Sequence, residues 1–399
     1  MNHRERVMTA ISHKEPDRLP VDLGGMRSSG IMAMAYQDLK DYLGIAGADL
    51  FIPDAAQQLA YVEEPIREWI GADVIPLDIG MAVGWRPYVL PNGVRAKICA
   101  NFLTEDDGSG GELVVDAKGN KLKHRPASSY YFDPIWHPLQ TAETKEEIDA
   151  YEWPILTDEE LELLCREAKR IREGEGRDHA VIGVLNAALL EIAQDVRGWD
   201  TFLMDIVSEP AIAERILDNM LESYFTNIDR YFRAVGEYID IIQVGGDLGT
   251  QKGPQMKPSI WYEMFQPREA AHWGHIKKVK PDIKIFMHSC GGIYPLIPGL
   301  IDAGLDILNP VQVSAEGMDP QRLKDDFGSR LTFWGGGTET QRVLPFGTPE
   351  DVYRNATELI RVFKPGGGFV FCQVHNIQAK VPPQNIEAMY QALHDNWAY

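Results

Sequence analysis

A short apolar run, a polar or glycine-rich loop and a helix-length amphipathic stretch follow one another repeatedly along this chain. The clearest apolar runs are 238–244, 283–287, 305–308, 331–334 and 368–371. Helical periodicity fills the intervals, over 293–303, 320–327, 349–363 and 385–394. Short buried strands that alternate with helices pair in parallel through crossover connections. The pattern therefore predicts an α/β protein built on a parallel sheet.

Three earlier apolar runs, at 19–23, 74–78 and 180–185, bring the number of expected strands to eight. Eight parallel strands with intervening helices close into a (β/α)₈ or TIM barrel. We therefore expect one barrel domain over residues 1–399, while an open doubly wound sheet would show the same alternation.

One region, from residue 85 to about 138, departs from the alternation. Asn92-Gly93 and Gly119-Asn120 are hairpin turn signals between segments of alternating polarity. They predict a β-hairpin insertion after the second strand, which would lie near the rim of the barrel. Its aromatic residues either cover a pocket or pack the hairpin itself.

The net charge of the chain argues against some classes of binding partner. Acidic residues outnumber basic ones 59 to 39, which gives a formal charge of −20. Such a surface repels phosphate backbones and anionic lipids, so neither nucleic acid nor a membrane is expected as a partner. The chain has no apolar stretch near the length of a membrane span and no signal-peptide core. Its four cysteines are too few for a disulfide framework, so a reducing cytoplasm is the expected location.

Reactive side chains gather at the expected carboxyl ends of the strands, where the active sites of barrels lie. These residues are Asp247, His288, Cys290, Asn309, Gln312, Glu339, Cys372 and His375. His288 and Cys290 leave one strand two positions apart, and Cys372 leaves the last strand at the same rim. Imidazole with two thiolates suits Zn²⁺ and leaves a fourth position open for substrate. The alternative is that both cysteines are small buried hydrophobes and His288 is a satisfied core histidine.

Other candidates at the rim have two interpretations each. Asp247 either orients a substrate or acts as a base, or it caps its turn. Asp247, Glu339 and His375 are all possible fourth ligands. Arg27, after the first strand, either binds a substrate carboxylate or is solvated at the surface.

Several segments resemble the uroporphyrinogen decarboxylase superfamily, and the resemblance extends over essentially the whole chain. The segments are Arg4-Glu5-Arg6-Val7, Pro16-Asp17-Arg18-Leu19-Pro20-Val21, Gly246-Asp247-Leu248-Gly249-Thr250-Gln251, Ile307-Leu308-Asn309-Pro310-Val311-Gln312, Phe333-Trp334-Gly335-Gly336, His375-Asn376-Ile377-Gln378 and Val381-Pro382-Pro383-Gln384-Asn385-Ile386. One branch of that superfamily contains metal-free decarboxylases that hold substrate carboxylates with arginines and a central Asp. The other contains cobalamin-dependent methyltransferases with zinc on His-x-Cys and a late Cys.

The resemblance to the second branch implies zinc on His288, Cys290 and Cys372. It implies catalytic roles for Asp247, Glu339 and His375, and substrate contacts for Arg27, Asn309, Gln312 and Asn376. The large size and the insertion favour an O-demethylase, which moves a methyl group from a small methoxylated, aromatic donor to the cobalt of a corrinoid partner protein. A methylcobamide:thiol methyltransferase and a metal-free decarboxylase are the alternatives. The expected oligomeric state is a monomer or a homodimer.

Overall fold

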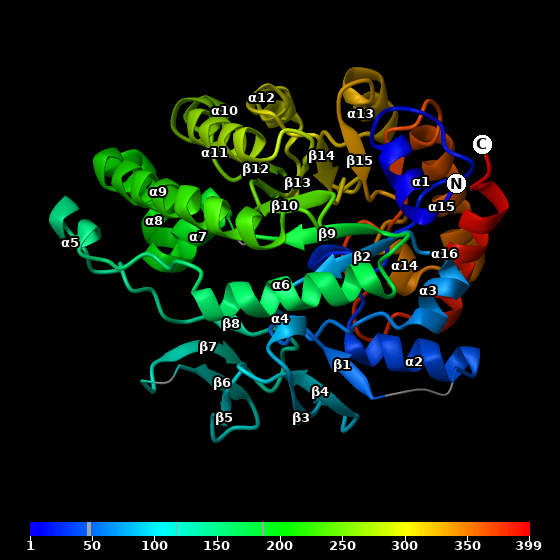
Figure 1. The fold of residues 1–399 in the computed structure, drawn as a ribbon, viewed down its shortest axis with the longest axis horizontal. Helices are drawn as coiled ribbons and strands as arrows, with labels where there is room; N and C mark the ends of the chain where they lie inside the picture. The colour runs from blue at the N-terminus through cyan, green and yellow to red at the C-terminus, as the bar shows by residue number, and fades with distance from the viewer. Residues whose placement is uncertain (46–48, 117, 186) are drawn as a thin grey trace.

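A computed structural model describes residues 1–45, 49–116, 118–185 and 187–399 of the chain. Its centre is a parallel sheet of seven strands in the order β16-β15-β14-β13-β10-β9-β2 (Figure 1). These strands are β2 (Val74–Leu77), β9 (Ala180–Val184), β10 (Ile241–Gly245), β13 (Lys284–His288), β14 (Ile307–Asn309), β15 (Thr332–Trp334) and β16 (Phe369–Val370). Each of the seven lies within or overlaps an apolar run that the sequence pattern singles out.

The first apolar run, at 19–23, lies between the two edges of this sheet. Val21 forms a parallel bridge with Phe371, just beyond β16. The Asp73 N–H, just before β2, donates to the Val21 carbonyl at 2.8 Å. The run therefore pairs with both edge strands and closes the ring, which confirms the predicted (β/α)₈ barrel and excludes an open sheet.

Amphipathic helices cover the outside of the barrel (Figure 1). The longer ones are α1 (His3–Ala10), α2 (Ala33–Leu43), α6 (Asp158–Glu173), α7 (Leu189–Arg197), α8 (Trp199–Ser208), α9 (Pro210–Val235), α11 (Gln266–Val279), α13 (Pro320–Phe327), α15 (Pro349–Phe363) and α16 (Pro383–Asn396). The shorter ones are α3 (Glu64–Ile70), α4 (Ile79–Ala82), α5 (Lys145–Asp149), α10 (Pro258–Ile260), α12 (Ile297–Ala303) and α14 (Val343–Phe346), with single turns at Arg27–Ser29, Trp261–Phe265 and Tyr294–Leu296. Capping boxes fix where α6 and α15 begin, because Thr157 and Thr348 each accept from the backbone three residues on.

Between β2 and α5 the chain forms antiparallel strands, where the sequence predicts the β-rich insertion. These strands are β3 (Trp85–Val89), β4 (Arg95–Cys99), β5 (Thr104–Asp106), β6 (Glu112–Val115), β7 (Lys121–Arg125) and β8 (Asp133–Pro134). They belong to two sheets rather than one hairpin, and β1 (Leu50–Ile52) joins the first by pairing in parallel with β4. A last small ribbon pairs β11 (Gly249–Thr250) with β12 (Gly253–Pro254). The Phe132 N–H donates to the Ala56 carbonyl at 3.0 Å, so the insertion packs on the loop between β1 and α3.

The interior of the barrel is filled with side chains. Inward-facing residues of the strands, including Ile241, Phe286 and Trp334, form one buried cluster, which Val7 of α1 and the following Ile11 join. Because the lumen is packed, substrates have access only to the carboxyl ends of the strands.

Three buried or half-buried aspartates tie the amino-terminal ends of the strands together. Asp73, Asp240 and Asp306 each directly precede a strand, β2, β10 or β14. Their carboxylates accept the backbone N–H groups of Val21, Val181 and Ile285 respectively, at 2.8–3.0 Å. Each aspartate therefore joins two adjacent strands at the closed face of the barrel.

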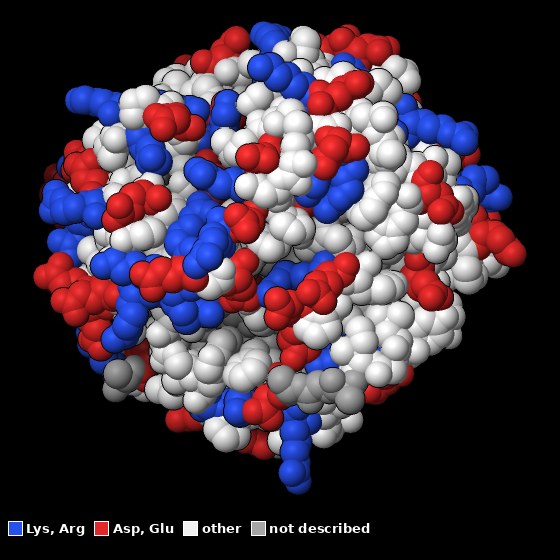
Figure 2. Space-filling model, turned by 45° about the vertical axis from the view of Figure 1, so that its right-hand side comes forward, with Lys and Arg blue, Asp and Glu red and all other residues white. Residues whose placement is uncertain are grey.

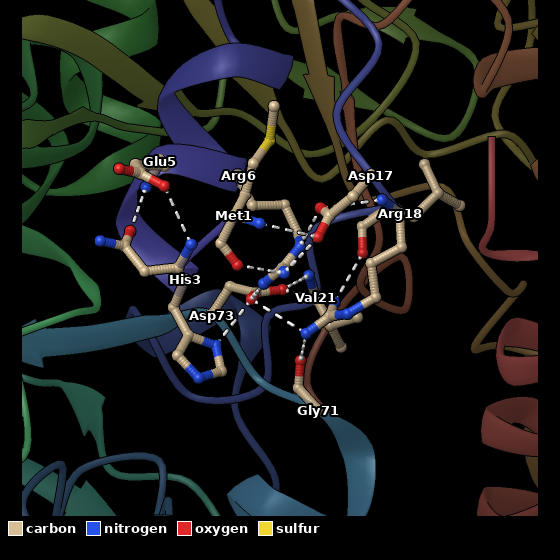
Figure 3. A network of polar contacts seen from close by, with 11 residues as sticks. Met1, His3, Glu5, Arg6, Asp17, Arg18, Val21, Gly71 and Asp73 are labelled. Atoms are coloured by element: carbon tan, nitrogen blue, oxygen red, sulfur yellow. Dashed lines mark hydrogen bonds and ion pairs between the residues drawn. The ribbon is translucent and has the colours of Figure 1, made fainter.

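Asp73 is the centre of the largest of these networks (Figure 3). Its fully buried carboxylate accepts from Arg6 Nη1 at 2.6 Å, Arg18 Nη1 at 2.8 Å and His3 Nδ1 at 2.8 Å. Arg6 also binds Asp17. The opening segments that resemble the superfamily therefore build this network, on the face of a barrel that serves stability rather than catalysis.

Acidic and basic side chains alternate over the face in Figure 2, although the chain as a whole is strongly acidic. Among the described residues, no helix has the length and apolar character needed to cross a bilayer.

Candidate metal centre

Three potential ligands meet at the carboxyl ends of the strands. His288 is the last residue of β13, Cys290 lies two positions on, and His375 lies in the loop after β16. Their ligand atoms all lie within 4.8 Å of one another. His288 Nε2 is 3.3 Å from Cys290 Sγ, and the two histidine rings lie 5.6 Å apart between centroids. Two imidazoles and one thiol at this spacing are a donor set for Zn²⁺ with room for a further ligand.

Asn309 fixes the orientation of His288. Its Oδ1 lies 2.6 Å from His288 Nδ1, and its Nδ2 donates to the Trp334 carbonyl at 2.7 Å. The second bond makes Oδ1 the acceptor, so His288 Nδ1 carries the proton and Nε2 keeps its lone pair. Metal-binding histidines are typically held in this way by a second polar group. Asn309, expected to contact substrate, is instead buried behind the ligand.

Gln312 and Asp247 hold the loop that carries Cys290. Gln312 Oε1 accepts from the Gly291 N–H, and Asp247 Oδ1 accepts from the Cys290 N–H, each at 2.7 Å. Gly291 has a φ of +88° and its Cβ position would meet backbone atoms at 2.4 Å, so only glycine fits this turn. Asp247 Oδ1 also lies 3.4 Å from His288 Nε2. Both residues thus lie at the site that the sequence predicts.

The pKa of His375 suits a bound cation, whereas the Cys290 thiol needs the cation to lose its proton. Burial, followed by the neighbouring His288, lowers the pKa of His375 to about 4, so this imidazole is neutral at pH 7. Burial and then Asp247 raise the pKa of the Cys290 thiol well above its usual value. A bound divalent cation reverses that balance, because a coordinated thiol loses its proton.

The predicted third ligand, Cys372, does not belong to this group. Its side chain is fully buried within the apolar cluster inside the barrel, and Asn309 Nδ2 lies 4.0 Å from its Sγ. Strand alternation explains the difference, because Val370 and Cys372 both face the interior while Phe371 faces outward. His375, expected to be a catalytic residue or a fourth ligand, takes the third position.

The structure places three other predicted residues in supporting contacts. The Glu339 carboxylate is buried and accepts the N–H groups of residues 341–343, so it caps the turn into α14 instead of facing the ligands. Asn376 Oδ1 accepts from the Gly30 N–H and its Nδ2 donates to Gln57. Arg27 pairs with Asp78, at 3.0 Å from Nε to Oδ2, rather than being free.

Glu191, in the first turn of α7, is not among the residues predicted from the sequence. Its side chain is accessible to solvent, and a Cβ on Gly246 would lie 2.9 Å from its Oε2, which puts it beside Asp247. Desolvation by the surrounding protein, then Asp247 and Asp195, raises the pKa of Glu191 to about 7. Little in the sequence marks Glu191, because it lies seven residues beyond the end of β9, in the first turn of a helix.

We expect Asn309→Ala to weaken zinc binding by about 10- to 100-fold without unfolding the barrel, because His288 would lose its tautomer and orientation. Competition with a chromogenic chelator measures the affinity. Gln341→Ala, which alters a residue outside these contacts, is the control. Unchanged affinity in the Asn309 variant would show that the bond to His288 is not needed for metal binding.

The buried carboxyl of Asp22 makes the stability of the fold depend on pH. Its fully buried carboxyl accepts from Trp334 Nε1 at 2.8 Å and from the Gly25 N–H at 2.7 Å. Burial raises its pKa from 3.8 to about 6, so the folded state favours the neutral acid. The contribution of the neutral Asp22 carboxyl to the free energy of unfolding is fully present below about pH 4 and is lost as pH rises through 6.

We therefore expect Asp22→Asn to gain stability relative to the native chain by up to about 3 kcal/mol between pH 4 and pH 7. Urea unfolding of both proteins across this range measures the difference. Because the two chains share every other titrating group, parallel profiles would contradict the assignment to Asp22.

Comparisons with known proteins identify relatives of this chain. The model of the uroporphyrinogen decarboxylase (URO-D) family matches residues 135–396. A uroporphyrinogen decarboxylase of Alkalilimnicola ehrlichii is 21% identical over 404 residues, covering 98% of this chain and 93% of the relative. The solved structure of a methyltransferase from Methanosarcina mazei is similar with a TM-score of 0.61 and 16% identity, over 99% of each chain. At this identity, the structural likeness supports the fold alone.

Proposed function

Because this chain belongs to the uroporphyrinogen decarboxylase family and gathers a His–Cys–His group at the mouth of its barrel, we propose that it is a zinc-dependent methyltransferase. The proposed donor is a small methoxylated aromatic compound, and the proposed acceptor is the cobalt of a corrinoid carried by a partner protein. The observation that carries the proposal is the convergence of three ligand atoms within 4.8 Å.

When bound, zinc would supply a Lewis acid with an open position for the ether oxygen of the donor. The chain's own residues prepare that position. Asn309 holds His288 in the tautomer whose Nε2 can bind the metal, while Asp247 and Gln312 fix the backbone on either side of Cys290. Glu191, beside Asp247, would donate a proton to the departing phenolate.

Decarboxylation of a porphyrinogen is the second candidate, because a decarboxylase is among the relatives of this chain. Such a substrate carries several carboxylates and needs cationic contacts. Arg27 at the mouth is flanked by two aspartates, Asp78 and Asp54. Glu191 lies beside Asp247, and after desolvation the charges of Asp247 and Asp195 raise its pKa, so further carboxylates gather near the metal ligands. This charge distribution favours methyl transfer from a donor without several carboxylates.

The test combines metal analysis with an assay of methyl transfer. We expect about one zinc ion per purified chain. Incubation with methoxylated aromatics and reduced corrinoid protein should convert the Co(I) absorbance to that of methyl-Co(III) and release the phenol. Cys290→Ser should lose both signals. A metal-free chain that releases CO₂ from a porphyrinogen would replace this proposal by decarboxylation.

A further inference from the structure

A small hollow opens at the carboxyl ends of the first three barrel strands. Apolar side chains of Met26, Leu59, Pro76, Met81 and Val184 contribute most of its lining. The hollow measures about 390 Å³ including its open part, and a group the size of a water molecule can be centred within only about 30 Å³ of it. The mostly apolar lining favours an uncharged group, and the space suits a substituent of about methyl size rather than a whole aromatic ring.

A hydrogen bond joins the lining of the hollow to the loop after β16, which carries the metal ligand His375. Gly30, which contributes to the lining, donates its N–H to Asn376 Oδ1 at 3.0 Å. Asn376 directly follows the ligand His375. A ligand in the hollow would therefore lie at the same end of the barrel as the three metal ligands.

Arg27 is the cation in the lining, and two fixed carboxylates face it. Its Nε lies 3.0 Å from Asp78 Oδ2 and 3.7 Å from Asp54 Oδ2. Asp78 is anchored by the Gly80 N–H at 2.8 Å, and Asp54 by the Gln57 N–H at 3.0 Å. Both aspartate side chains are less than 10% exposed. A ligand carboxylate would thus have to approach two buried negative charges to reach one guanidinium.

We infer that this hollow receives an uncharged ring substituent of the methyl donor, and that Asp78, together with Asp54, excludes ring carboxylates by keeping Arg27 paired. The identity of the ligand as a methyl donor rests on the proposed function. The exclusion follows from charge, because juxtaposed like charges at a binding surface reject the wrong ligand. Asp78 is therefore a specificity-determining residue that lies outside the metal centre.

The test measures binding to the zinc-loaded full chain by calorimetry, with no corrinoid present, so no methyl transfer occurs. The two probes are 4-methoxyphenol and 4-methoxybenzoate, which differ chiefly by one charge. We expect the phenol to bind at least about tenfold more tightly. Met81→Trp fills the hollow and should weaken phenol binding at least about tenfold. Met204→Trp, the same change at a 60% exposed position on α8, should have no effect.

Asp78→Asn provides the second measurement. The amide can still cap α4 but no longer neutralises Arg27, so affinity for 4-methoxybenzoate should rise about tenfold while the phenol is unaffected. Circular dichroism checks that each variant is folded. Tighter binding of the benzoate by the native chain, no change in Asp78→Asn, or binding of neither probe would each overturn the subsite. Failure of the proposed function would appear separately, as the absence of methyl-Co(III) in the corrinoid assay.

Discussion

The His375→Ala protein is expected to lose its zinc and, with it, all measurable methyl transfer. Zinc sites with a full ligand set contribute roughly 10–16 kcal/mol of binding free energy. Removal of one of a few ligands should therefore cost about 3–4 kcal/mol, or several hundredfold in affinity. Because His375 is neutral at pH 7, no proton competes for its nitrogen and the loss should show no strong pH dependence above pH 5. Metal analysis after dialysis against a weak chelator measures it.

Cys372→Ala is the matched control for this prediction. The Cys372 side chain lies inside the apolar cluster of the barrel, so its truncation should lower stability by about 1 kcal/mol and leave the zinc in place. The pair of variants separates the ligand set seen in the structure from that expected from the sequence. Zinc retained in His375→Ala and lost in Cys372→Ala would reverse the assignment.

The fold can be predicted from the sequence because parallel strands are buried on both faces and therefore appear as short apolar runs. The run at 19–23 belongs to the barrel even though it makes a single bridge to the last strand. The His288–Cys290 spacing is also informative, since both residues follow one strand end within a single turn.

The third ligand cannot be chosen from the sequence in the same way. Cys372 and His375 lie three positions apart after a strand whose exact end the sequence does not mark. Strand alternation continues through residue 372 and keeps Cys372 inside the barrel, whereas the chain beyond it turns and brings His375 to the mouth. The choice therefore depends on where the strand ends.

Polar residues of the barrel rim present a related difficulty. Asn309, Gln312 and Glu339 occupy strand ends, where sequence reasoning expects contact with substrate. Their amides and carboxylate instead bind a ligand imidazole or backbone N–H groups. A position at a strand end indicates that a residue lies near the site. Whether its side chain faces substrate or supports a metal ligand depends on which neighbouring N–H groups need a hydrogen-bond acceptor.

At the amino-terminal face of the barrel, a repeated aspartate has a role that only the structure shows. The sequences Asp73-Val74-Ile75, Asp240-Ile241-Ile242 and Asp306-Ile307-Leu308 repeat an aspartate before an apolar strand. In the barrel these aspartates bond the neighbouring strands, so the repeat marks every second strand from β2 to β14. In sequence alone, each aspartate looks like an ordinary turn residue.

Asp73→Asn is expected to destabilise the fold by about 3–5 kcal/mol, because it removes one partner of a buried ionic network. The side chains of Arg6 and Arg18 are 7% and 15% exposed, so their charges would stay largely desolvated without the Asp73 carboxylate. Urea unfolding of native and variant chains measures the loss. The metal centre lies at the opposite end of the barrel, so the zinc content of the folded variant should not change.

Asp306→Asn is the matched control, since Asp306 occupies the same position before its strand and also accepts a neighbouring backbone N–H. Its partners Lys277 and Lys284 are 30% and 28% exposed, so water can solvate their charges once the carboxylate is gone. We expect a loss of only about 1 kcal/mol there, as is typical of accessible ion pairs. Equal losses in the two variants would mean that the bond to the neighbouring strand, rather than the burial of the arginines around Asp73, determines the stability of this face.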